Sequence, residues 1–137
     1  SALWQKQFAI ANAHNTGFLM VFLAALELSH WQFKQLSANK ALLKTMIAAQ
    51  QEVFAALHAE YGSKASMVLR QIKPWMLPVI LKLARHVAPL DMETYLQAHF
   101  MKVRSQTLLL LDAYVQRANK SGIAVPNLQG LVDKLDR

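Results

Sequence analysis

Apolar residues recur at steps of three and four positions along almost the whole chain, which is the spacing of one face of an α-helix. The first predicted helix covers residues 3–28, in which Trp4, Phe8 and Phe18 follow this spacing. Gly17 lies inside that helix and weakens it by roughly 1 kcal/mol relative to alanine, so it indicates either a close helix crossing or a bend. Alternating runs of β-branched residues, which are typical of strands, do not occur in the sequence.

Residues that begin or end helices divide the rest of the chain. Gly62 is suited to end the helix that follows the polar break at residues 37–39, and Asp91 is suited to cap a later helix. Because proline has no backbone N–H, Pro74 and Pro78 predict a break near Lys73 and a new helix starting at 75–78. After the first helix we predict a helix over 40–60, a third segment from Lys64 to the break near Lys73, and a helix from 75–78 that ends before Pro89. The later predicted helices are 92–104, the one from Ser105 to Ser121-Gly122, and 127–136.

The same spacing predicts which side chains face the core. Three sets are expected to point inward: Leu43, Ile47, Gln50, Phe54 and Leu57; Tyr95, Leu96, Phe100 and Val103; Leu128, Leu131, Val132 and Leu135. No repeat or shift in composition divides the chain. We therefore predict an all-α fold in a single helical domain over residues 1–137.

The composition supports an ordered chain, since 54% of the residues are apolar and only four are glycine and four proline. With no cysteine there are no disulfides and no thiolate metal sites, which fits a reducing compartment, and we expect a cytoplasmic protein. The longest apolar run, residues 18–26, is about half the length needed to cross a bilayer. We interpret it as part of a buried helix and expect no association with a membrane.

The formal net charge of +7 comes from fifteen Lys and Arg residues against eight acids. Basic residues are scattered, and the densest stretch, residues 61–90, contains Lys64, Arg70, Lys73, Lys82 and Arg85 without an acid. This stretch could attract a phosphate or a carboxylate, or it could simply form a solvated basic face. Nucleic-acid binding is the least favoured interpretation, because the cations are not gathered beside stacking aromatic residues.

Self-contained catalytic motifs are missing from the sequence. It has no Gly-rich phosphate loop, no His-Glu-x-x-His motif and no Gly-x-Ser-x-Gly motif. None of the five histidines has another four residues away, so no two imidazoles share a helix face at metal-ligand spacing. We therefore predict no metal site.

Two stretches resemble the ketopantoate reductase (2-dehydropantoate 2-reductase) family. The first is Leu3-Trp4-Gln5-Lys6, followed by a long helix rich in Asn and small residues. The second is Lys-Val-Arg-Ser-Gln-Thr at 102–107, followed by about four helical turns, the turn Ser-Gly-Ile-Ala-Val-Pro-Asn at 121–127 and a short apolar helix. In element order the resemblance covers essentially the whole chain, but the specific residues number about a dozen.

The resemblance implies a C-terminal helical domain of the kind called 6-phosphogluconate dehydrogenase C-terminal-like. In that family the domain follows an N-terminal Rossmann domain, and NADP and a 2-keto acid lie in the cleft between the two domains. The strand, Gly-rich turn and helix of a dinucleotide site do not occur in these 137 residues. The implied function is reduction of a 2-keto acid by hydride transfer, with a changed substrate, and this chain alone is expected to be inactive.

The resemblance also implies site residues. Lys6 matches the catalytic lysine, which would neutralise charge on the keto oxygen. Asn12, His14, Lys102, Ser105 and Gln106 are the candidate substrate-binding residues.

The sequence departs from the family at two places. Ile10 and His14 stand one and two turns after Lys6, where the family has asparagines, and Gln106 stands where it has a glutamate. These departures put the substrate of the family in doubt. A shared site requires Lys6 to lie near the polar side chains around residue 106.

Two other interpretations remain open at this point. Lys6 can be an ordinary exposed lysine, and His99, Lys102 and Gln106 can be a solvated polar stripe. The chain would then be a helical interaction or dimerisation module without catalysis. The apolar residues around the whole circumference of the first helix also predict burial by another chain, and we expect a homodimer.

Overall fold

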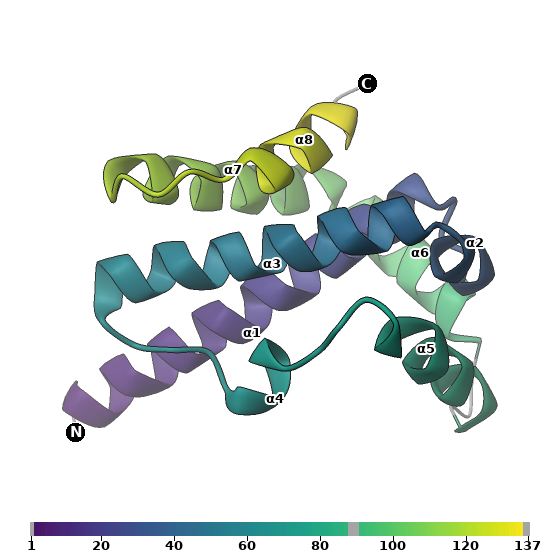
Figure 1. Ribbon diagram of the computed structural model, residues 1–137, viewed down its shortest axis with the longest axis horizontal. Coiled ribbons are helices and arrows are strands. Elements are labelled where there is room, and N and C mark those ends of the chain that lie inside the picture. Colours follow the sequence, from purple (N-terminus) through teal and green to yellow (C-terminus); the bar gives the residue numbers. More distant parts are fainter. Residues whose placement is uncertain (1, 88–90, 136–137) are drawn as a thin grey trace.

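The computed structural model describes residues 2–87 and 91–135, and all of their regular secondary structure is helical. This confirms the predicted all-α class. In chain order the helices are α1 (Ala2–Leu28), α2 (Phe33–Ala38), α3 (Lys40–Tyr61), α4 (Met67–Arg70), α5 (Met76–Val87), α6 (Met92–Lys102), α7 (Arg104–Lys120) and α8 (Pro126–Leu135) (Figure 1).

The two longest helices, α1 and α3, cross at Gly17. A Cβ atom placed on Gly17 would lie only 2.6 Å from Cγ1 of the buried Val53, so the crossing has no room for a side chain. One residue further along α1, the carbonyl oxygen of Phe18 accepts a hydrogen bond of 2.9 Å from Nε2 of the buried Gln50. Of the two roles considered for Gly17, the structure therefore supports a close helix crossing.

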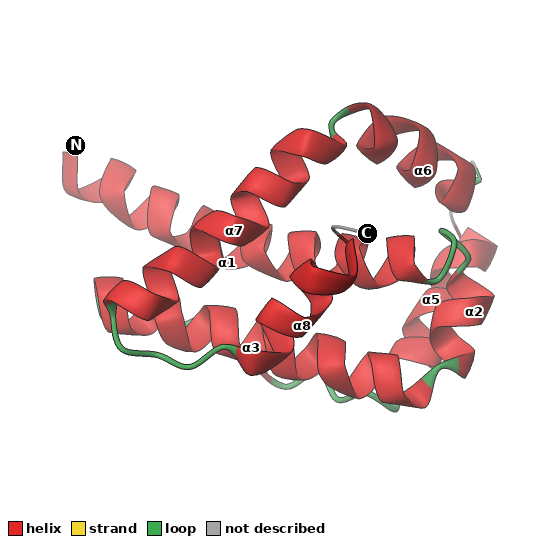
Figure 2. Ribbon diagram, turned by 90° about the horizontal axis from the view of Figure 1, so that it is seen from above, coloured by secondary structure: helices red, strands yellow, loops and turns green. Residues whose placement is uncertain are grey.

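The hydrophobic core surrounds the middle and C-terminal part of α1. Residues 20, 21 and 23–26 of this helix are buried, and α3, α7 and α8 pack around them (Figures 1 and 2). By length and composition α1 is the described helix that could cross a membrane. In this structure residues 20, 21 and 23–26 of α1 are buried in the helical bundle, whereas Leu3, Trp4 and Phe8 near its N-terminus are exposed.

Several helix ends follow from local residues, as predicted. Gly62 has φ of 72° and ends α3, and Gly122 has φ of 71° in the turn after α7, a backbone conformation that favours glycine. Asp91 caps α6 by accepting a hydrogen bond from the backbone N–H of Thr94. Asn39 caps α3 in the same way, through the N–H of Leu42.

Two other helices have their N-termini capped by glutamates from distant parts of the chain. The carboxylate of Glu52 in α3 accepts hydrogen bonds from the backbone N–H groups of Asn127 and Leu128, at 3.2 and 2.9 Å, at the start of α8. Glu93 in α6 accepts one of 3.0 Å from the N–H of Phe33, at the start of α2. Helix α8 was still predicted, because Pro126 marks its start locally. The sequence around α2 has no such local signal, since Gln32 makes no side-chain cap, and this helix was not predicted.

Other differences from the predictions concern single side chains and boundaries. Tyr95, which was expected to face inward, is 53% exposed, whereas Leu96 is buried. The predicted helix 92–104 ends at Lys102, because α7 already begins at Arg104. The helix start predicted at 75–78 is confirmed, because α5 begins at Met76. Pro78 is its third residue, where its missing N–H would have no intrahelical partner. The predicted boundaries at Pro89 and Asp136 lie outside the described residues.

Arg104 joins three helix ends. Its guanidinium donates to both carboxylate oxygens of Glu27 near the end of α1, at 3.0 and 3.2 Å, and to the backbone carbonyl of Leu135 at the end of α8. A bidentate arginine–carboxylate pair has a defined geometry, so it fixes direction as well as distance. The N-terminus of α7 is therefore held at the C-terminal ends of α1 and α8.

The crossing at Gly17 predicts that Gly17→Ala destabilises the protein by about 1–3 kcal/mol, because the buried, β-branched Val53 has little freedom to move away. The matched control is Gly130→Ala in α8, where an added Cβ meets nothing within 4 Å. This control should stabilise the protein by about 0.5–1 kcal/mol through helix propensity alone. Urea unfolding followed by circular dichroism measures both, and equal stability of the two variants would contradict the prediction.

Candidate functional site

The first turns of α1 extend beyond the other helices (Figure 2). Leu3, Trp4 and Phe8 in this segment are exposed by 66%, 63% and 55%, and the rings of Trp4 and Phe8 stack with their centroids 5.5 Å apart. Large exposed apolar side chains that lie together on one segment are typical of a surface that docks against another protein surface. We call residues 2–13 the projecting segment of α1.

Lys6 lies on the projecting segment and its side chain is exposed. At about 100° per residue, Lys6 has nearly the same direction from the helix axis as Ala13 and Gly17, which lie seven and eleven residues later. Gly17 faces α3 at the crossing. Lys6 therefore points to the side of α1 that faces the bundle further along the helix. At the position of Lys6 itself, α1 extends beyond the bundle.

His14 lies at the base of the projecting segment and is 2% exposed. Neither of its ring nitrogens has a hydrogen-bond partner among the described residues, and its ring lies 5.7 Å from that of Phe54. Burial lowers the pKa of His14, the nearby backbone of Ser63 partly opposes this, and the neighbouring His58 lowers it further. The imidazole is therefore held neutral near pH 7.

Asn12 is also on the projecting segment, and it is exposed. It comes six residues after Lys6, so its direction differs by about 120°, toward the side of the helix that carries Phe8. Lys6, Asn12 and His14 thus lie on one stretch of α1 but do not converge on one point.

Lys102, Ser105 and Gln106 are exposed and lie at the opposite end of the bundle. Helix α7 runs antiparallel to α1, because the Tyr114 hydroxyl donates to the carbonyl of Ala13 at 3.0 Å whereas Arg104 pairs with Glu27. Glu27 comes 21 residues after Lys6 on the same helix, which places Gln106 roughly 25–30 Å from Lys6. The structure does not bring the two halves of the expected site together.

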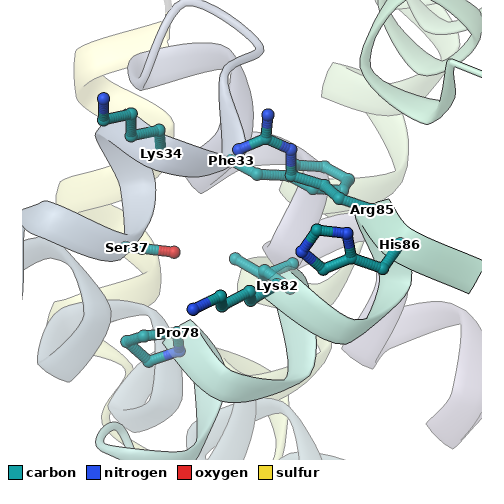
Figure 3. A pocket seen from close by; sticks show the side chains of 8 residues that line it. Phe33, Lys34, Ser37, Pro78, Lys82, Arg85 and His86 are labelled. Atoms are coloured by element: carbon teal, nitrogen blue, oxygen red, sulfur yellow. The ribbon is translucent and has the colours of Figure 1, made fainter.

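A different concave site lies between α2 and α5. It is a groove of about 460 Å³ whose polar lining residues are Lys34, Ser37, Lys82, Arg85 and His86 (Figure 3). The acid-free stretch at residues 61–90 pointed to two of these cations, Lys82 and Arg85. The residues from α2 were missed because that helix has no local cap, although its Phe and Leu at 33 and 36 have helical spacing.

The described residues do not fit a metal or a dinucleotide. No three side chains of His, Cys, Asp or Glu gather as a metal cluster in 2–87 and 91–135. The same ranges contain no strand, so they lack the strand, Gly-rich turn and helix that hold a dinucleotide pyrophosphate. NADP would therefore have to be bound by a different domain.

Comparison with protein-family models, with characterised proteins and with solved structures finds no match to this chain. The ketopantoate reductase resemblance thus rests on the residues quoted above, and the fold is described here as an all-α bundle.

The burial of His14 predicts that the protein becomes less stable as the pH falls. The folded state keeps this imidazole neutral, whereas the unfolded chain protonates it near pH 6.5, so the unfolded state binds more protons below that pH. The free energy of unfolding should therefore decrease from pH 7.5 to 5.5. Asp91, whose pKa is lowered by hydrogen bonds from Thr94, loses its contribution only at more acidic pH, as it protonates.

Urea unfolding at pH 7.5 and 5.5 tests this, with His14→Leu expected to flatten the dependence on pH. The control is His99→Gln, which removes an exposed histidine and should retain the wild-type dependence. An unchanged pH dependence in His14→Leu would show that another group is responsible.

Proposed function

We propose that this chain is the substrate-side helical domain of an NADP-dependent oxidoreductase of the ketopantoate reductase type, which reduces a 2-keto acid. The observation that supports this is the projecting segment of α1. It presents Lys6 on turns that also carry the exposed apolar side chains of Leu3, Trp4 and Phe8. At about 100° per residue Leu3 lies roughly 60° from Lys6 around the helix axis, whereas Trp4 and Phe8 lie roughly 160° from it, on the opposite face. A nucleotide-binding domain would therefore have to contact the Leu3 side of α1 to enclose the amine of Lys6 between the two domains.

The proposed chemistry needs a cation at that position. Reduction of a ketone carbon places negative charge on the keto oxygen, and an ammonium group within hydrogen-bond distance stabilises that charge and supplies the proton. Lys6 provides three N–H donors on a long side chain. Exclusion of water by the docked domain would strengthen this interaction, because the effective dielectric constant falls.

Because the two halves of the expected site lie far apart, the proposal keeps only the candidate residues on α1. Lys102, Ser105 and Gln106 lie roughly 25–30 Å from Lys6 and give it no support. Of the expected substrate-binding residues, Asn12 and His14 are on the same part of α1. The docked domain would have to supply the groups that bind the substrate carboxylate.

The second candidate is a helical dimerisation or interaction module without catalysis. The distance between Lys6 and residues 102–106 favours this candidate, because the two halves of the expected site do not meet. A second exposed apolar surface, on α5, also favours it. Its residues, exposed by 43–77%, are Val79, Ile80, Leu83 and Val87. A module of this kind needs docking surfaces but no catalytic amine.

Both candidates fit a cytoplasmic homodimer that binds no nucleic acid. Light scattering tests the dimer, and a result that finds only monomer at high concentration would exclude it.

The decisive measurement is NADPH oxidation with a panel of 2-keto acids, made on the protein that contains this chain together with its nucleotide-binding domain. Lys6→Ala should lower kcat by at least about 100-fold, whereas the control Lys134→Ala, at an exposed lysine in the last turn of α8, should change it by less than about 2-fold. Wild-type activity in Lys6→Ala, or no oxidation with any 2-keto acid, would contradict the proposal and leave the interaction module.

A further inference from the structure

The groove between α2 and α5 concentrates positive charge. Lys82, Arg85 and His86 line it from α5, and Lys34 lines it from α2. Among the described residues that line it, none is Asp or Glu. An acid lies on the α6 side, where Oε1 of Glu93 is 3.8 Å from Nε of Arg85 and Oε2 accepts a hydrogen bond from the N–H of Phe33. The groove itself therefore favours an anion.

Hydrogen-bond donors from both walls face the interior of the groove. Figure 3 shows the hydroxyl of Ser37 and the ammonium of Lys82 pointing toward one another, with the His86 ring turned to the same space. The side chains of Lys34 and Arg85 extend to the rim. An ammonium, a hydroxyl and an imidazole are three separate donors, and a phosphate group has three terminal oxygens that accept charge-assisted hydrogen bonds.

Apolar surface borders these donors. The floor of the groove is formed by the buried side chains of Phe33 and Leu81. Pro78 of α5 also lines the groove. Val79, 56% exposed, lies roughly 60° around α5 from Lys82, and Leu83 and Val87 lie further round the helix, outside the groove lining. A ligand whose anionic group sits among the donors would therefore have apolar surface within reach for the rest of the molecule.

We propose that the groove between α2 and α5 binds a phosphate monoester that carries an apolar group. Its phosphate is held by Lys82, Ser37 and His86, and its apolar part lies on α5. Inorganic phosphate would occupy only the part of the site formed by Lys82, Ser37 and His86 and would leave the apolar part empty. A nucleic-acid backbone needs cations spread along a track, whereas these cations surround one pocket. This site lies on elements that carry neither Lys6 nor the projecting segment, so it is independent of the proposed oxidoreductase function.

Isothermal titration of the chain with phenyl phosphate and with inorganic phosphate tests the proposal. Phenyl phosphate should bind at least about 5-fold more tightly, because burying an aromatic ring adds to the affinity. Lys82→Gln should weaken phenyl phosphate binding by about 10-fold or more, and Ser37→Ala by about 3-fold, as expected for one charged and one neutral hydrogen bond. The control Lys120→Gln removes the same charge from an exposed lysine at the end of α7 and should change binding by less than about 2-fold.

Vesicles of phosphatidylcholine with and without phosphatidic acid identify the source of the phosphate. Binding that requires phosphatidic acid, depends on Lys82 and is displaced by phenyl phosphate supports the site with a lipid headgroup as its ligand. Titration with phenyl phosphate but no binding to either vesicle supports the site with a soluble ester as its ligand. Any of three results would overturn the proposal. The first is equal affinity for the two phosphates, and the second is equal weakening of binding by Lys82→Gln and Lys120→Gln. The third is no titration with phenyl phosphate up to about 10 mM, a concentration that would reveal even weak charge-driven binding.

Discussion

The close contact of α1 and α3 at Gly17 is the constraint on which the rest of the bundle depends. With no Cβ between them, the two helix axes can approach until Val53 meets the backbone of α1, and the amide of Gln50 can reach the carbonyl of Phe18. This pair then offers one continuous surface to α7 and α8, which pack on both members. A larger residue at this position would separate the surfaces that the two later helices cover.

Where the sequence correctly predicted a helix end, the signal for that end is local. Residues such as Asp91 and Gly62 act on backbone groups within a few positions, so their effect can be derived without knowing the fold. Helix α2 begins instead where Glu93, sixty residues later in the chain, accepts the N–H of Phe33. Such a cap exists only after the chain has folded, and the sequence around Phe33 does not indicate it.

In the candidate site too, the arrangement of residues on one helix could be predicted from the sequence, whereas the distance between residues on different helices could not. Lys6, Asn12 and His14 lie on one helix, α1, and their directions around it follow from the fixed rotation per residue. The distance from Lys6 to Gln106 depends on how α7 lies against α1, and that is set by the contacts of Tyr114 and Arg104. The groove between α2 and α5 depends in turn on a helix without a local signal. Its cations could be suspected from the composition of one segment, but its shape could not.

The two ends of the bundle differ in how they are held. At one end Arg104 joins three chain segments, whereas at the other α1 continues alone past the hydrogen bond between Tyr114 and Ala13. The projecting segment, residues 2–13, thus forms an arm of about 18 Å that is held at its base by this hydrogen bond and by the close contact at Gly17. A force on the tip of this arm therefore acts on the bundle through the contacts at that base, Tyr114 of α7 and Val53 of α3.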